Sequence, residues 1–248
     1  MEIHKIVDVH CHLHEYSNDE IQAISMLGID IIAVSDDYHS SIRTLSLSEK
    51  YRWVIPAIGI HPWNITSNSI NEFYRLKELV NKLKNKIKIF GEIGLDKKFK
   101  PETYTNQLQI FGLFIELGEE LKVIPNIHAA GAWKEALGIL INSDIPSAII
   151  HWYTGPVELL KDIENRGFYI SINPAIAIQE KHREIVAKAP LDIILIESDA
   201  PYRYRGMVLH PRNVYDVLKH LAEIKNMKYE EAYEVIVRNY RKLRTLII

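Results

Sequence analysis

Six side chains of types that bind metal ions follow short apolar runs of strand character. The runs cover residues 5–9, 87–90, 123–127, 147–150 and 191–196 and are rich in Ile and Val. The side chains are four imidazoles and two carboxylates: His10, His12, Glu92, His128, His151 and Asp199. Such a set holds divalent metals that activate water for hydrolysis. If the carboxyl ends of parallel strands meet, the six groups share one pocket, which predicts a divalent-metal-dependent hydrolase.

His10 and His12 are separated by one residue. Residues i and i+2 of an extended strand point to the same side, so both imidazoles can bind one ion. The same alternation turns Cys11 away from them and argues against Cys11 as a nucleophile. A lone His-x-His pair is more often structural, so its interpretation as a metal site depends on the other fragments. His128 and His151, at equivalent ends of successive strands, favour that interpretation.

We assign catalytic roles to the two carboxylates, Glu92 and Asp199. A carboxylate after a buried strand is costly to leave unpaired, and each oxygen of Glu92 can bind one metal. Asp199 could bind a metal and also accept a proton from the attacking water. The structural alternatives are helix capping for both residues and, for Glu92, an ion pair with Lys97 or Lys98.

A further set of residues near the same strand ends is expected to support the metals or to contact substrate. His61 follows the third strand and is expected beside the metals rather than on them. Glu197 precedes Asp199 and could face the barrel interior or a metal ligand. The whole second set is His61, Glu197, Tyr202, Arg203 and Lys97.

The composition is that of an ordinary globular protein of 248 residues, 47% hydrophobic and 25% charged. A formal net charge of −2 gives no overall attraction to nucleic acid, so a polyanion would need a local basic patch. One cysteine excludes an internal disulfide and is typical of a reducing cytosol. The N-terminus is too short and charged for a signal peptide, and the apolar runs are too short to cross a bilayer. We therefore expect a cytoplasmic protein.

Apolar runs alternate with amphipathic segments along the chain. Helical spacing is clear in the series Phe73, Leu76, Val80 and Leu83. Eight strands are expected, at 5–10, 29–35, 53–60, 87–92, 123–128, 147–151, 168–172 and 192–197. This alternation, without a linker or repeat, predicts an α/β fold of the (β/α)8 barrel type, a single domain over residues 1–248. An open doubly wound sheet is the alternative, but it would leave some predicted ligands far from its crevice.

Taken in order, the motifs resemble those of the TatD family of metal-dependent deoxyribonucleases, which are amidohydrolase-like barrels. The segments that carry the resemblance are 10–12, 59–62, 91–96, 127–128, 151–155 and 197–202. The resemblance implies that His10, His12, Asp199 and Glu92 bind a first metal. It implies that Glu92 bridges to a second metal bound by His128 and His151. It also implies two divalent ions, drawn from magnesium, manganese or zinc.

Two departures from the family pattern lie on the substrate side of the expected pocket. Residues 129–133 replace a polar residue and an arginine that many family members carry, and His14 stands where the family often has Asp. The expected reaction is phosphodiester hydrolysis, with DNA, single-stranded or at an end, as substrate. The alternatives are hydrolysis of a small ester, lactone or amide, and a metal-binding adaptor without turnover. The cations that could meet phosphates, or simply form a solvated rim, are Lys97, Lys98, Lys100, Arg203, Arg205 and Arg212.

Overall fold

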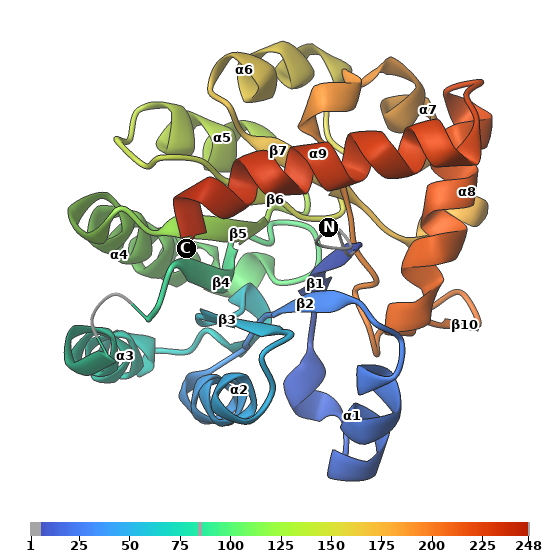
Figure 1. Ribbon diagram of the computed structural model, residues 1–248. Coiled ribbons are helices and arrows are strands. Elements are labelled where there is room, and N and C mark those ends of the chain that lie inside the picture. The colour runs from blue at the N-terminus through green and yellow to red at the C-terminus, as the bar shows by residue number, and fades with distance from the viewer. Residues whose placement is uncertain (1–5, 84–85, 248) are drawn as a thin grey trace.

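The computed structural model describes residues 6–83 and 86–247 and contains a barrel of parallel strands surrounded by helices (Figure 1). The strands lie in chain order around the barrel. They are β1 (Val7–Cys11), β2 (Asp30–Ala33), β3 (Val54–Ile58), β4 (Ile89–Gly94), β5 (Ile124–His128), β6 (Ile149–Ile150), β7 (Tyr169–Ile172) and β8 (Ile194–Ile196). The amides of Asp199 and His12 donate to the carbonyls of His10 and Ala200 at 2.9 and 2.8 Å, which joins β1 to the end of β8. The predicted (β/α)8 class is confirmed; residue 5, the first of the strand predicted at 5–10, lies outside the described residues.

Helices connect the strands and cover the outside of the barrel. They are α1 (Asn18–Ser25), α2 (Tyr38–Lys50), α3 (Ser69–Leu83), α4 (Tyr104–Leu121), α5 (Trp133–Ile141), α6 (Leu160–Asn165), α7 (Glu180–Lys188), α8 (Val214–Ile224) and α9 (Tyr229–Ile247). In α3 the predicted apolar series is buried at Phe73, Leu76 and Val80. A two-stranded hairpin, β9 (Arg203–Tyr204) and β10 (Met207–Val208), follows β8. Across the described ranges, no helix is both long and apolar enough to cross a membrane.

The barrel interior has its own apolar core, to which every strand from β1 to β8, or the residue directly after it, contributes. Its buried members include Ala57 of β3, Ile124 of β5 and Leu195 of β8. Tyr240, Leu243 and Ile247 of α9 pack in the same cluster. Figure 1 shows α9 lying across the strands. The last helix therefore covers one end of the barrel, and the end at which the strands finish stays available for a site.

The two strands that carry His10 and Glu92 depart from regular pairing. The register of β1 on β2 shifts between Asp8 and Cys11, and that of β4 on β5 shifts between Phe90 and Ile93. A shift of this kind re-aims side chains, and such shifts are frequent next to active sites. At Gly91, a Cβ would lie 2.8 Å from the Cβ of Asn126, so only glycine lets β4 approach β5 here.

Candidate metal centre

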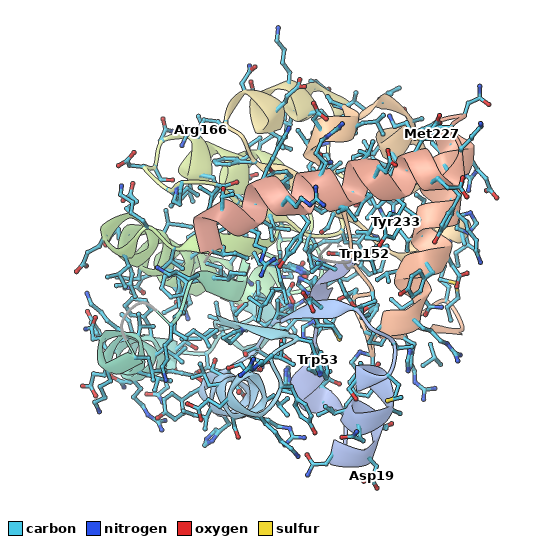
Figure 2. The ribbon with its side chains drawn as sticks, in the orientation of Figure 1. Asp19, Trp53, Trp152, Arg166, Met227 and Tyr233 are labelled. Atoms are coloured by element: carbon cyan, nitrogen blue, oxygen red, sulfur yellow. The ribbon has the colours of Figure 1, made fainter. Side chains whose placement is uncertain are left out.

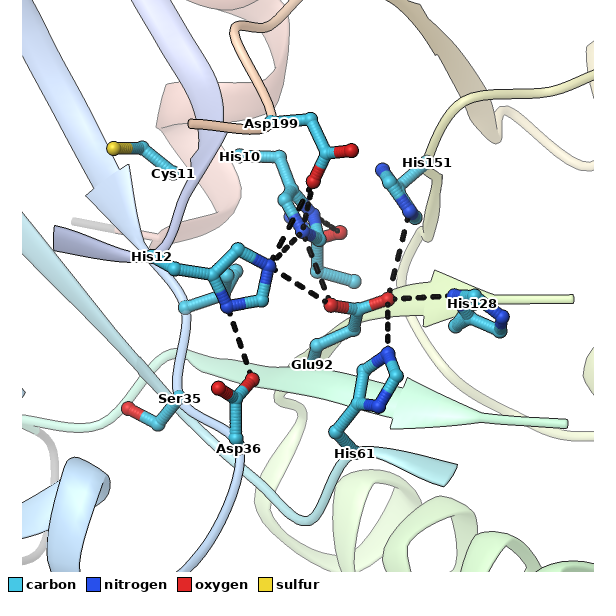
Figure 3. A network of polar contacts seen from close by, with 12 residues as sticks. His10, Cys11, His12, Ser35, Asp36, His61, Glu92, His128, His151 and Asp199 are labelled. Carbon is cyan, nitrogen blue, oxygen red and sulfur yellow. Dashed lines mark hydrogen bonds and ion pairs between the residues drawn. The ribbon is translucent and has the colours of Figure 1, made fainter. Parts of the chain in front are cut away.

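The strand ends bring all six predicted ligands together around the carboxylate of Glu92 (Figure 3). Glu92 is 1% exposed and lies in β4, the strand with the second register shift. Cys11, between two of the ligands, points away from the cluster, and its Sγ lies 3.4 Å from the carbonyl oxygen of Ala200. This is the orientation that strand alternation predicts.

Oε2 of Glu92 faces the two histidines of the first strand. The Nε2 atoms of His10 and His12 lie 3.2 and 3.3 Å from it and 3.4 Å from each other. Oδ1 of Asp199 lies 3.7 Å from each of these nitrogens. Four ligands about 2.0–2.1 Å from a tetrahedral ion are about 3.3 Å apart. The spacing of these four atoms is therefore suited to enclosing one ion.

Oε1 of Glu92 faces a second group of imidazoles. Nδ1 of His128 lies 2.9 Å from it and Nε2 of His151 lies 3.5 Å from it. Nε2 of His61 is 3.3 Å from the same oxygen, so His61 stands level with these two residues rather than behind them. Each oxygen of Glu92 thus meets a separate group of nitrogen donors, which is the geometry that a bridging carboxylate needs.

Each of the four predicted histidine ligands has its outer ring nitrogen close to an oxygen acceptor. Such a partner keeps the proton on the outer nitrogen and leaves the lone pair of the inner one for a metal. The arrangement is the usual support of metal-binding histidines, and it indicates that the donor set suits a divalent ion. The pairs are His10 Nδ1–Asn126 Oδ1 at 2.9 Å, His12 Nδ1–Asp36 Oδ1 at 3.0 Å, His128 Nε2–Asp96 Oδ2 at 3.0 Å and His151 Nδ1–Glu197 Oε1 at 3.1 Å.

Sequence reasoning missed three of these four supporting residues: Asp36, Asp96 and Asn126. A signal existed for Asp36, because it follows the second strand as the predicted ligands follow theirs. Asp96 lies in the same motif as Glu92 and also accepts a hydrogen bond from Nε1 of Trp63 at 2.6 Å. Asn126 lies inside β5, where its chemistry depends on a neighbour 116 residues away.

From the sequence, Glu197 could face either the barrel interior or a metal ligand. In the structure it lies behind His151. Its Oε1 also accepts the backbone N–H of Trp152 at 2.9 Å, and the hydroxyl of Ser171 donates to its other oxygen. Glu197 is 0% exposed, so it supports a predicted ligand from inside the barrel.

The other predicted substrate residues lie around the cluster. Tyr202 and Arg203 follow Asp199 and are exposed, Tyr202 at 42%. Lys97 is exposed in the loop after β4, where its Nζ lies 3.2 Å from Oε1 of Glu135. His14 is occupied on both ring nitrogens, at 3.1 Å from the carbonyl oxygen of Val34 and 3.1 Å from Oδ2 of Asp36.

Charges in the cluster are strongly coupled. Burial alone would raise the pKa of Glu92, but the imidazoles of His61, His10 and His151 hold it well below its ordinary value. Burial disfavours the imidazolium of His10, but the charge of Glu92 outweighs it and raises the pKa of His10 to about 9. His128 follows the same pattern, with hydrogen bonds to Asp96 and Glu92 raising its pKa to about 9. The raised pKa values favour protonated imidazoles at His10 and His128 when no metal is bound, so metal binding there would release protons.

Residues 7–244 match the sequence model of the TatD-related DNase family. The chain belongs to this family. Membership confirms the resemblance noted in the sequence and, with the relatives described next, places the chain among metal-dependent hydrolases.

Individual relatives cover nearly the whole chain. An uncharacterized metal-dependent hydrolase of Methanocaldococcus jannaschii is 30% identical over 242 residues, 95% of this chain and 95% of that protein. Human deoxyribonuclease TATDN3 is 25% identical over 259 residues, covering 96% of this chain and 94% of that protein. The crystal structure of YjjV, a TatD homolog from Escherichia coli K12, superposes with a TM-score of 0.84 at 23% identity, covering 94% and 95% of the two chains. This last likeness establishes the shared fold.

Proposed function

We propose that the protein is a deoxyribonuclease that hydrolyses phosphodiester bonds, with two divalent ions (magnesium, manganese or zinc) bound around Glu92. The observation that carries the proposal is that the two oxygens of Glu92 face two separate groups of nitrogen donors. His10, His12 and Asp199 would complete the first position, and His128 and His151 the second. The choice of DNA is supported by the name of human TATDN3, a deoxyribonuclease.

The protein groups have distinct tasks in this proposal. When bound, the two ions supply Lewis-acid stabilisation of the phosphate and lower the pKa of water. Asp199 accepts the proton of the attacking water, because its Oδ1 faces both first-group imidazoles and its side chain is nearly buried. Glu92 keeps the two groups of imidazoles at a fixed separation. Tyr202 and Arg203 lie at the open side, where the flanking parts of a single-stranded substrate or strand end would lie.

The test compares substrates and metals. Purified protein is incubated with a labelled single strand, the corresponding duplex and p-nitrophenyl acetate, each with magnesium, manganese, zinc or a chelator. We expect metal-dependent cleavage of DNA that exceeds ester hydrolysis. Faster ester than DNA hydrolysis would favour a small-molecule enzyme, and metal binding without turnover of any substrate would favour an adaptor.

Metal content tests the site itself. Elemental analysis should find one to two divalent ions per chain, falling sharply in a His10→Ala, His12→Ala double variant. His220→Ala serves as the control, since His220 lies on α8 and pairs with Glu223 at 3.2 Å. Unchanged metal in the double variant would overturn the assignment.

The dependence of rate on salt separates DNA from a small neutral substrate. Contacts with phosphates release counterions, so the cleavage rate at low DNA concentration should fall steeply as salt rises. Replacing Lys97, Lys98 and Lys100 by Ala should flatten this dependence. The expected flattening is smaller than for three free lysines, because Lys97 pairs with Glu135 and Lys100 lies 3.9 Å from Glu102. A rate insensitive to salt would contradict a DNA substrate.

A further inference from the structure

Two groups of aromatic rings flank the metal centre on facing sides of the barrel mouth. The first group is Trp152, Tyr202 and Tyr204, which follow β6 and β8. The second is Trp63 and Phe99, which follow β3 and β4. Because β4 and β8 are four places apart in a ring of eight strands, their ends lie across the mouth from each other. In the view of Figure 2 Trp152 lies near the centre of the outline, whereas Asp19 and Arg166 lie toward its edge.

Trp152 of the first aromatic group directly follows the predicted ligand His151 in the chain, and a cation lies beside the group. The ring of Trp152 lies 6.0 Å from that of Tyr202 and 5.0 Å from that of Tyr204. Its Nε1 donates to Oε1 of Gln179 at 2.9 Å, which holds the indole in place. The guanidinium of Arg205 lies 5.5 Å from the centre of the Tyr204 ring.

The second group also consists of neighbouring aromatic rings with a cation beside them. The rings of Trp63 and Phe99 are 6.1 Å apart and 40% and 56% exposed. Trp63 donates to Asp96, the residue that also contacts His128, so this group is tied to the second set of imidazoles. The ammonium of Lys98 lies 4.8 Å from the centre of the Phe99 ring.

Exposed rings with a cation beside them match the chemistry of a nucleotide. A base presents a flat π face that stacks on an aromatic ring, and the phosphate attached to it attracts a cation. Stacking of this kind tolerates any base, but it requires a base outside a duplex, because in a duplex the neighbouring base pairs already cover both faces of each base. If these rings only packed the core, they would be buried. Tyr202, Trp63 and Phe99 are instead exposed to solvent.

We propose that the two aromatic groups stack on the nucleobases on either side of the scissile phosphodiester and so position the single strand of the proposed function by its bases. This proposal rests on the proposed phosphodiesterase function. The phosphate between the two bases then lies over Glu92 and Asp199. The smallest good substrate has a base on each side of the cleaved bond, and cleavage shows little dependence on sequence.

Binding to a strand that cannot be cleaved tests this proposal independently of turnover. The probe is a fluorescein-labelled hexathymidylate with phosphorothioate linkages, titrated with the metal-loaded protein and followed by fluorescence polarisation. Loss of one base–aromatic stack weakens binding by about 5- to 150-fold. We expect a loss in that range for Tyr202→Ala and for Phe99→Ala. Tyr202→Phe and Phe99→Tyr keep the ring and should keep the affinity. Tyr74→Ala, an exposed tyrosine on α3, is the matched control.

A strand with one abasic position identifies the interaction as stacking. Removing the base should weaken binding to the wild-type protein, and the matching alanine variant should then show no further loss. If both alanine variants bind within twofold of wild type, the aromatic groups do not hold bases. If the variants lose the same factor on intact and on abasic strands at every position, their effect is not stacking, and the proposal fails. Binding with the expected losses but no cleavage of any DNA would instead refute the proposed function and leave the stacking positions standing.

Discussion

Five imidazole nitrogens converge on the two carboxylate oxygens of Glu92 at 2.9–3.5 Å. A buried anion is unfavourable unless it is paired, and without metal the imidazoles of His10 and His128, whose pKa values are raised to about 9, provide the pairing. A divalent ion replaces these protons, so metal affinity should increase with pH toward the raised pKa of about 9 of His10 and His128. Glu92 would thus be paired with imidazoles in the metal-free protein and, in the proposed function, with metal ions in the loaded site.

Replacement of Asp199 by Asn separates metal binding from proton transfer. The amide keeps the size and one oxygen of the carboxylate but cannot accept a proton at neutral pH. At saturating metal, turnover of DNA should fall by about 10²- to 10⁴-fold while the metal content stays near that of wild type. Asp144→Asn, at the exposed pair with Lys122, is the control. A rate within about threefold of wild type would show that Asp199 is only a ligand.

Asn126 provides a test of the supporting contacts. Its Oδ1 lies 2.9 Å from Nδ1 of His10 and its Nδ2 donates to the carbonyl of Val9 at 2.8 Å. Asn126→Leu keeps the volume but frees His10 to rotate or change tautomer, so metal affinity should fall by about 10- to 100-fold. Competition with a chelator measures this change. An unchanged affinity in a folded variant would mean that packing alone orients His10.

At the scale of elements, close approach of strands requires glycine at particular places. Gly94 ends β4 with φ of 143°, and a Cβ there would lie 2.0 Å from the carbonyl oxygen of His128. The backbone of β4 therefore fits against β5 only without a side chain at this position. This contact sets the distance between Glu92 and His128, which come from the two strands.

Gly94→Ala should accordingly lower the free energy of unfolding by about 2–4 kcal/mol through backbone strain and steric overlap. The matched control is Gly138→Ala in α5, where the added Cβ would have no atom within 4 Å apart from its chain neighbours and the adjacent backbone of its own helix. That variant should gain about 0.4–1 kcal/mol, because alanine restricts the unfolded chain and suits a helix. Urea unfolding measures both. Equal effects of the two substitutions would show that β4 can move away from β5 at little cost.

At the scale of the whole molecule, stability and chemistry lie at opposite ends of the barrel. The apolar interior and α9 close one end, and the six predicted metal ligands lie at the other. One buried histidine belongs neither to the apolar interior of the barrel nor to the candidate metal centre. His182 of α7 is 0% exposed, and within residues 6–83 and 86–247 neither ring nitrogen has a hydrogen-bond partner. Burial, helped by the charge of His151, lowers its pKa from the ordinary 6.5 to about 3.

This lowered pKa predicts a loss of stability in mild acid. The folded protein holds His182 neutral while the unfolded chain binds a proton below pH 6.5, so its contribution is present above 6.5 and is lost as pH falls toward 3. Between pH 7 and 5 the loss is about 2 kcal/mol at 1.36 kcal/mol per pKa unit. His182→Leu should remove this part of the slope in urea unfolding at a series of pH values. His220→Leu, on the surface, should leave the slope unchanged.

The eight strands and the identity of the groups that meet at their ends could be predicted from the sequence. Buried parallel strands need continuous apolar runs, and a polar ligand directly after such a run is visible in the chain order, as at His128 and Asp199. The alternation of strands and helices left an open sheet as an alternative to the (β/α)8 barrel, and the positions of the predicted ligands along the chain decided for the barrel. The catalytic and ligand roles of the residues stay predictions, although the geometry is consistent with them.

Only the tertiary structure decided how those groups are supported and what surrounds them. Asn126 reaches His10 across 116 positions, and Asp96 joins Trp63 to His128, because barrel closure brings together loops that no local pattern relates. His61 likewise reaches Oε1 of Glu92 only once β3 and β4 pair. Hydrogen-bond partners and ring contacts depend on distances of a few ångströms, and these are set by strand register and side-chain packing in the folded barrel rather than by neighbours in the chain.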